Sequence, residues 1–412
     1  MHRTLFVALF VIFCFSGTLF GQKVIDDIKP TVILISLDGF RYDYLDKHQP
    51  PNMVKLAKNG VRAKWMQPSF PTKTNPNHYT VVTGLYPANH GIVDNTIYDY
   101  GVVMKMSDRR ELEKPRWWGG EPIWGTAENQ GQISANFFWP GSEAPIGGKM
   151  SANYRLYNGY VPFSYRVDKL LSYLDLPQKQ RPTILTLYYE ETDEVGHEFG
   201  PESEELKYAV MEADAIIGRL MDGLSRRGIA DKVNVIITSD HGMATYDARK
   251  VVYLDEAFDQ SLAEQVIYSS PLAQIFPKPG KLEAIFEKVK SLKNLTCTRK
   301  EELPERFQYK QGKRVAPIFC VADKGWIVSD RKSHESWINN QDGIDRPRGN
   351  HGYDNEMQEM QVTFIAHGPA FKQGLLAEPF ANIEVYNLMC KILGLTPAKN
   401  DGKLERVKHM LR

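Results

Sequence analysis

The stretch Thr31-Val32-Ile33-Leu34-Ile35-Ser36-Leu37-Asp38 carries the clearest fold signal, because an apolar run is followed at once by a carboxylate. A short run rich in β-branched residues is typical of a strand buried on both faces. Similar runs at 184–189, 233–239 and 361–366 alternate with helical patterns. This alternation predicts an α/β fold, with a mostly parallel sheet and helices on both faces.

The strongest helical pattern follows Ser203, a good N-cap residue. Apolar residues then recur at three- and four-residue steps from Leu206 to Leu224, and Gly228 offers a stop. This apolar stripe predicts a core helix with no direct part in chemistry.

Two stretches fit the alternation poorly, 93–162 and 278–335. We expect them to be insertions over the carboxyl edge of the sheet, where substrate-selecting loops usually lie. The main domain is predicted over 28–400. The basic C-terminal tail, 401–412, is expected to fray.

Composition indicates a globular protein without the excess of basic residues that duplex nucleic-acid binding requires. The 412 residues are 42% hydrophobic and 25% charged, with a formal net charge of +1. A duplex-binding protein usually carries a basic surface that neutralises phosphates. We therefore expect no duplex nucleic acid as a partner, and any phosphate recognition should be local.

The N-terminus has the pattern of a secretory signal over 1–21. Arg3 precedes the apolar run 5–15, and small and polar residues follow. The run is short for a membrane span, so a secreted or periplasmic protein is expected. A non-cleaved anchor is the alternative, because Leu19 is a poor residue before cleavage at Gly21.

Beyond this signal, three cysteines remain: Cys297, Cys320 and Cys390. An odd number rules out a complete disulfide framework. Either Cys297 pairs with Cys320, or all three are buried thiols.

Six side chains of the metal-ligand type lie in short segments that mostly close predicted strands. They are Asp38, Asp193, His197, Asp240, His241 and His351. Asp193 and His197 are four residues apart, close enough on one helical turn to share an ion. Three carboxylates and three imidazoles suit a pair of zinc ions. The turn 71–79 carries hydroxyl groups and could supply a nucleophile, which suggests two-metal phosphoryl transfer through a threonine intermediate.

Together these motifs resemble the nucleotide pyrophosphatase/phosphodiesterase family of the alkaline phosphatase superfamily. The similarity covers nearly the whole chain after the signal, and its motifs lie at 36–41, 71–74, 83–87, 119–124, 193–201, 239–243 and 351–355. The resemblance implies an alkaline phosphatase-like fold and two Zn²⁺ ions. One ion would be held by Asp193, His197 and His351, and the other by Asp38, Asp240, His241 and the Thr74 hydroxyl.

The resemblance also implies catalytic roles. Thr74 is the favoured nucleophile and Thr72 the competing one, because the family's phosphate-binding asparagine falls 21 positions later, at Asn95. Asn95 and the Thr74 amide would stabilise the phosphate charge. Lys73 is either a phosphate contact or a solvated loop lysine.

Substrate choice depends on two further positions. Tyr157 falls where nucleotide-type relatives place a ring beneath the base. A core tyrosine of the insertion is the alternative. Asn75 stands where those relatives usually have an aromatic residue. It could hydrogen-bond a base edge or ribose, or signal a different leaving group.

The resemblance therefore implies a secreted dizinc phosphodiesterase that releases nucleoside 5′-monophosphates from a small-molecule nucleotide or other phosphodiester. A choline- or glycerol-type phosphodiesterase on the same scaffold is the alternative, and a phosphomonoesterase is disfavoured. An alternative from a different functional class is a non-catalytic extracellular binding protein.

Overall fold

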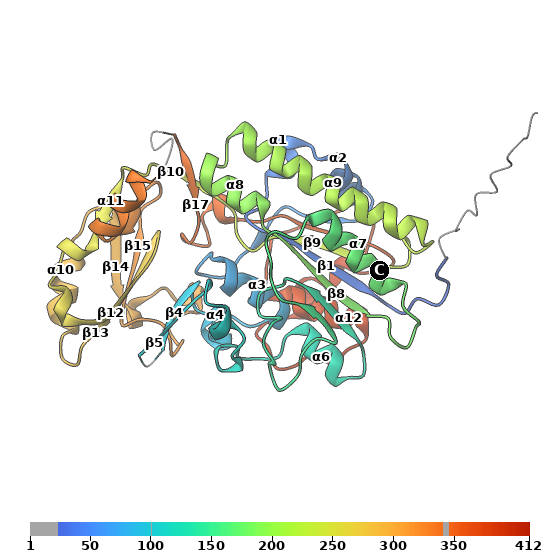
Figure 1. Cartoon of the computed structure of the whole chain (residues 1–412), viewed down its shortest axis with the longest axis horizontal. Coiled ribbons are helices and arrows are strands. Elements are labelled where there is room, and N and C mark those ends of the chain that lie inside the picture. Colours follow the sequence, from blue (N-terminus) through green and yellow to red (C-terminus); the bar gives the residue numbers. More distant parts are fainter. Residues whose placement is uncertain (1–23, 100, 341–345) are drawn as a thin grey trace, which may run out of the picture.

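The computed structural model describes residues 24–99, 101–340 and 346–412, so the expected signal at 1–21 lies outside the described residues. Figure 1 shows a large body built on a twisted sheet and a smaller lobe beside it. Within the described residues, no helix is long and apolar enough to cross a membrane.

The body is built on an eight-stranded sheet, and most neighbouring strands are parallel, as predicted. Strand β18 is the exception, because it runs antiparallel to both of its neighbours. In spatial order the strands are β19 (Leu375–Ala377), β2 (Val61–Ala63), β18 (Phe364–His367), β9 (Asn234–Thr238), β1 (Val32–Leu37), β8 (Ile184–Tyr189), β6 (Ser134–Phe137) and β7 (Asn153–Arg155).

Both faces of this sheet are covered, which explains why the central strand is apolar at nearly every position. Val32 and Leu34 of β1 pack into one core, and Ile33 and Ile35 pack into the other. Helices lie above and below the sheet in Figure 1. The second core uses α1 (Tyr44–His48), α2 (Pro51–Lys58), α7 (Phe163–Leu174) and α9 (Glu204–Arg226), and the first uses α3 (Thr74–Thr83), α6 (Ile123–Asn129) and α12 (Glu384–Leu393).

Helix α9 begins and ends where the sequence predicts. The Ser203 hydroxyl accepts a hydrogen bond from the backbone N–H of Leu206 at 3.1 Å, which satisfies one free donor of the first turn. Gly228 follows the helix with a positive φ of 66°.

The lobe has its own sheet and core. Its four antiparallel strands are β12 (Ala263–Ser269), β13 (Leu272–Pro277), β15 (Ile318–Ala322) and β14 (Leu295–Arg299), with α10 (Leu282–Val289) packed beside them. Cys297 and Cys320 face each other on β14 and β15 and form a disulfide, which decides between the two interpretations of the cysteines. Cys390 is a free, buried thiol of the body.

Shorter elements connect body and lobe. Parallel strands β11 (Val251–Tyr253) and β16 (Ile327–Ser329) precede α11 (Arg331–Asn339), while β10 (Ala244–Tyr246) pairs with β17 (Arg348–Asn350). The remaining α-helices are α4 (Pro87–His90), α5 (Arg109–Leu112) and α8 (Glu191–Phe199), and the remaining strands form the pairs β4 (Thr96–Asp99) with β5 (Val102–Lys105) and β3 (Met66–Gln67) with β20 (Phe380–Ala381).

The expected insertions differ from the observed segments. The stretch 93–162 contains α6 and β6, and β6 is an inner strand of the main sheet. Its sequence, Ser-Ala-Asn-Phe, has no β-branched residue, so the sequence does not predict a strand there. The lobe sheet begins at Ala263, earlier than the expected start at 278.

The expectation that 401–412 frays is wrong for the described structure. Val407 and Met410 are fully buried in the body core, and Leu411 bridges Phe371. Leu404, Val407 and Met410 recur every third residue, so the apolar side chains point inward between the basic ones.

Candidate functional site

The six ligand-type side chains meet at the carboxyl edge of the main sheet. Asp38 directly follows β1, whereas Asp240 and His241 follow β9. Gly39 makes this convergence possible, because it has a positive φ of 67° and a Cβ atom there would lie 3.0 Å from the Cα of Asp193. The strand-end positions predicted from the sequence therefore form one cluster.

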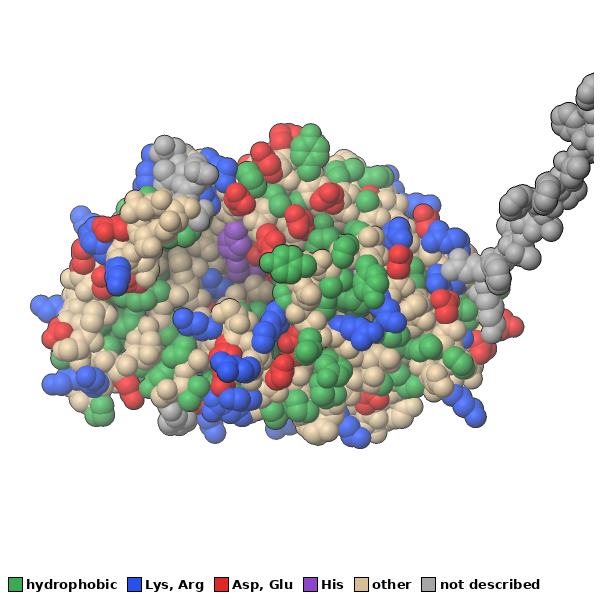
Figure 2. All heavy atoms as spheres, viewed as in Figure 1, with side chains coloured by type: hydrophobic (Ala, Val, Ile, Leu, Met, Phe, Trp, Pro, Cys, Tyr) green, Lys and Arg blue, Asp and Glu red, His purple; other side chains and the backbone are tan. Residues whose placement is uncertain are grey.

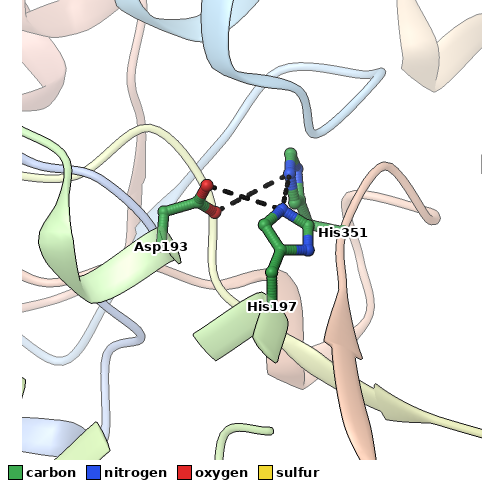
Figure 3. A group of neighbouring side chains, drawn as sticks. All are labelled: Asp193, His197 and His351. Carbon is green, nitrogen blue, oxygen red and sulfur yellow. Dashed lines mark hydrogen bonds and ion pairs between the residues drawn. The ribbon is translucent and has the colours of Figure 1, made fainter. Parts of the chain in front are cut away.

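The first ligand group joins Asp193, His197 and His351 (Figure 3). Asp193 and His197 lie one turn apart on α8, and His351 follows β17. The Nε2 atoms of the two histidines are 3.1 Å apart, and Asp193 Oδ2 is 3.4 Å from His197 Nε2. The three side chains point toward one another from two separate elements.

The second ligand group is centred on the buried ring of His241. Its Nε2 atom lies 3.0 Å from Asp240 Oδ2 and 3.3 Å from Asp38 Oδ1. The Thr74 hydroxyl is also 3.3 Å from this nitrogen. Asp193 connects the two groups, because its Oδ1 atom is 3.9 Å from the same nitrogen.

The outer ring nitrogens identify the tautomer of each cluster histidine. The Nδ1 atoms of His197, His241 and His351 lie 2.9, 2.9 and 2.8 Å from backbone carbonyl oxygens. A carbonyl oxygen can only accept, so each Nδ1 carries the proton and donates. Each neutral ring then turns the lone pair of Nε2 toward the cluster, which is the arrangement of metal-binding imidazoles.

The carboxylates are crowded in a way that suits cations. Within the described residues, Asp38 Oδ1, Asp193 Oδ1 and Asp240 Oδ2 are buried and take part in no hydrogen bond. Burial and the neighbouring carboxylates raise the pKa of Asp38 well above its ordinary value. Burial also lowers the pKa of His351 well below its ordinary value. Positive ions would offset this repulsion, and the donor set of oxygen and nitrogen atoms fits divalent zinc.

The two threonines that compete as nucleophile, at the start of α3, have hydroxyl groups with different partners. Thr74 is the first residue of α3, and its hydroxyl faces His241. Thr72 is fully buried, donates to the carbonyl of Tyr353 and accepts from the N–H of Gly352, both at 2.9 Å. The Thr72 hydroxyl is therefore engaged in holding two segments together.

Asn95 lies beside the same turn. Its Oδ1 atom accepts a hydrogen bond from the backbone N–H of Asn75 at 2.9 Å. This bond holds the side-chain amide of Asn95 next to Thr74. At that place it could donate to a phosphate oxygen together with the backbone amide of Thr74.

Lys73 is not the solvated loop lysine that the sequence allowed. Its side chain is buried, and Nζ donates to the carbonyl of Ser270 at 2.6 Å. Burial lowers the pKa of Lys73 to about 8, although Asp94 and Asp193 oppose this shift.

Tyr157 lies half-buried on the wall of a pocket of about 270 Å³. Its hydroxyl donates to Glu190 at 3.2 Å, and its ring packs against Phe138. Asn75 and Tyr188 also line this pocket. Because the Tyr188 hydroxyl donates to Asp38 Oδ2 at 2.6 Å, the pocket adjoins the ligand cluster.

Several residues that support the cluster were not predicted from the sequence. His78 lies one turn after Thr74 and groups with Asp38 and Asp240, but both of its ring nitrogens already bond to Thr74 and Ser36. The spacing of four from Thr74 was its only signal. Tyr188 and the buried Arg166–Glu190 ion pair had no signal, because their partners are distant in sequence.

A second recess adjoins the cluster at His197, between the body and the lobe. It has a volume of about 560 Å³ and is lined by residues that include His197, Trp337 and Asn350. Figure 2 shows histidine side chains at the bottom of this recess. The cluster is therefore reached from solvent between the body and the lobe.

Comparisons with known proteins agree with this geometry. Residues 32–354 match the family model described as type I phosphodiesterase / nucleotide pyrophosphatase. A venom phosphodiesterase of Macrovipera lebetinus is 40% identical over 394 residues, which are 92% of this chain and 45% of that protein. Ectonucleotide pyrophosphatase/phosphodiesterase family member 1 of Homo sapiens is 40% identical over 397 residues, 93% of this chain and 42% of the relative. The chain thus spans about half the length of the curated relatives it matches.

Solved structures show the same fold. Murine ectonucleotide pyrophosphatase/phosphodiesterase 5, an inactive threonine-to-alanine variant in complex with AMP, is 36% identical and superposes with a TM-score of 0.86. The match covers 93% of this chain and all of that one. The human protein gives the same TM-score at 35% identity. From its family match and its fold, the chain belongs to the type I phosphodiesterase / nucleotide pyrophosphatase family.

Proposed function

We propose that this chain is a dizinc nucleotide pyrophosphatase/phosphodiesterase that releases nucleoside 5′-monophosphates through a phosphothreonine at Thr74. The substrate would be a small nucleotide with a phosphoanhydride or phosphodiester bond. A mononuclear site or a non-catalytic binding protein would not need two adjacent ligand groups with a hydroxyl at their edge.

The observation that carries this proposal is the orientation of the three cluster imidazoles. Each donates from Nδ1 to a carbonyl, so each presents Nε2 to the buried carboxylates. His197 and His351 bring two such nitrogens within 3.1 Å of each other. Two lone pairs held this close repel unless a proton or a metal ion lies between them, and a shared metal ion also satisfies Asp193.

The ligand sets follow from the two groups. Asp193, His197 and His351 would hold one zinc ion, while Asp38, Asp240, His241 and Thr74 would hold the other. When bound, these ions supply Lewis-acid charge to the phosphate and help to ionise the attacking hydroxyl and, later, water.

Thr74 would attack phosphorus with its hydroxyl oxygen while the bond to the leaving oxygen breaks on the opposite side. Water then cleaves the phosphothreonine, so two in-line steps retain configuration at phosphorus. Asn95 is held beside Thr74 by its bond to Asn75, which positions its amide to donate to an equatorial oxygen. Lys73 would contribute positive charge below the pH at which it loses its proton.

The pocket beside the cluster favours a nucleotide over a choline ester. Arg109 places its guanidinium carbon 4.4 Å from the centroid of the Tyr157 ring, so a cation already covers that face. A quaternary ammonium headgroup would be repelled there, whereas a planar base can stack on both groups. The AMP bound to the murine relative supports the same substrate class.

We also propose that the protein works in an oxidising compartment, secreted or periplasmic. The disulfide between Cys297 and Cys320 supports this, because disulfides persist mainly outside the cytosol.

The test compares p-nitrophenol release from the thymidine 5′-monophosphate ester and from p-nitrophenyl phosphocholine. We expect clear preference for the thymidine ester, loss of turnover on chelation and recovery with zinc. Preference for the phosphocholine ester would move the choline-type alternative ahead. Absence of turnover from zinc-loaded protein on both esters would favour the binding protein.

A further inference from the structure

Asn75 offers an unused amide inside the pocket that holds Tyr157. The residue lies in the first turn of α3 and is buried, yet it lines this pocket. Neither its Oδ1 nor its Nδ2 has a hydrogen-bond partner in the described part of the chain. Buried amides are almost always paired, because an unpaired donor or acceptor loses the hydrogen bonds of water. An adjacent donor and acceptor are therefore left unpaired at the wall of this pocket.

Arg109 lies over the ring of Tyr157 and lines the same pocket. Its guanidinium carbon lies 4.4 Å from the ring centroid, and Nη1 is 3.3 Å from Glu143 Oε1. Glu143 also accepts from the backbone N–H of Tyr157, so one carboxylate holds both walls. The Arg109 side chain is 44% exposed and its contacts with Glu143 are 3.3 and 3.4 Å long, so only weak contacts hold it over the ring.

We propose that a nucleobase enters between the Tyr157 ring and the Arg109 guanidinium, and that the Asn75 amide pairs with the polar edge of that base. The proposal rests on the proposed function and specifies how the same site recognises its substrate. Guanidinium planes stack on bases as aromatic rings do, so Arg109 supplies a second face. Asn75 then contributes edge recognition at the inner end of the slot.

Adenine fits this amide on either of its edges. Its exocyclic amino group donates, and the ring nitrogen on each side of that group accepts. An asparagine amide presents the complementary acceptor and donor side by side. Removal of the amino group should therefore weaken binding only while Asn75 is present.

The first experiment measures inhibition of the zinc-loaded enzyme by AMP and by purine riboside 5′-monophosphate, which lacks only the amino group. Wild type should bind AMP about tenfold more tightly, the lower end of what one bidentate base contact provides. In Asn75→Leu, a variant of similar volume, the two ligands should bind alike. A misfolded fraction would weaken both ligands equally, so it cannot imitate this loss of preference. An unchanged preference in Asn75→Leu would overturn the role of Asn75.

The second experiment compares AMP with ribose 5-phosphate, which has no base. The AMP preference should fall about fivefold or more in Arg109→Leu, from the loss of one stacking face. The matched control is Arg110→Leu, an exposed neighbour outside this pocket, which should keep the wild-type preference. Equal preferences in the two variants would overturn the role of Arg109.

Failure of the proposed function gives a different pattern. If wild type binds AMP no better than ribose 5-phosphate, the pocket does not take a base, and both the nucleotide function and this inference fail. If wild type prefers AMP but neither variant changes that preference, only the inference fails.

Discussion

The ligand cluster and the proposed base pocket, which Asn75, Arg109 and Tyr157 line, adjoin each other but are built in different ways. Asp38 and Asp240 come directly after or close to the ends of neighbouring parallel strands, so the topology of the sheet brings them together. Tyr157 and Arg109 instead lie in the long segment between β5 and α7, and side-chain contacts with Glu143 join them. The cluster is thus determined by the scaffold, whereas the pocket depends on local packing.

If this division is right, changes in the cluster impair every substrate and changes in the pocket impair only substrates with a base. The largest expected effect is that of Thr74→Ala, which removes the proposed nucleophile and should lower kcat by at least ~10⁴ for all esters. Thr74→Ser should keep part of the activity. Steady-state rates with the thymidine ester and with bis(p-nitrophenyl) phosphate check this.

Thr72→Ala is the matched comparison for Thr74→Ala, because the two hydroxyls lie on one turn but Thr72 bonds to Tyr353 and Gly352. We expect it to lower stability and to retain turnover. An inactive Thr72→Ala together with an active Thr74→Ala would show that the nucleophile is misassigned.

The next effect is that of Asn95→Ala. It should lower kcat by roughly 10²–10³, the usual result of deleting one donor to a developing negative charge. The loss should be similar for esters with and without a base. A loss confined to nucleotide esters would instead place Asn95 in the base pocket.

Tyr157→Ala tests the other side of the comparison. Relative to bis(p-nitrophenyl) phosphate, kcat/KM for the thymidine ester should fall about tenfold, because stacking contributes ~1–3 kcal/mol to binding. The change should lie mainly in KM, since ground and transition states share this contact. Equal losses for both esters would mean that the ring is only core packing.

The smallest expected effect concerns the charge of Lys73. Burial lowers its pKa to about 8, so the positive charge is present below that pH and is lost as the pH rises through it. AMP, whose phosphate is already mostly the dianion at pH 7, should inhibit about fivefold less well at pH 9 than at pH 7, roughly 1 kcal/mol for one screened charge. In Lys73→Met this pH-dependent difference should disappear, and its persistence would assign the titration to another group.

The sequence predicted the ligand cluster far better than its surroundings. A residue that directly follows a buried parallel strand lies at the carboxyl edge of the sheet. Asp38, Asp240 and His241 could therefore be grouped from the sequence alone. The strand β6 could not be recognised, because Ser134 to Phe137 lacks a β-branched pattern. The stacking of Arg109 on Tyr157 could not be predicted from the sequence either, since the two residues are 48 positions apart.

The C-terminal tail shows the same limit in another form. Its basic residues suggested a solvated end, but packing is decided by the apolar residues between them. Val407 and Met410 fill space in the body core next to Phe371, and only the folded core reveals that space.

The most direct test of the central claim is the zinc content of the purified protein, measured by elemental analysis for wild type and two histidine variants. The two ligand groups predict two zinc ions per chain in wild type and about one in His351→Ala, which loses a ligand of the first group only. The control, His367→Gln, changes a histidine of β18 outside the cluster and should keep both ions. Wild-type protein that binds no zinc, or His351→Ala that keeps two ions as His367→Gln does, would contradict the account.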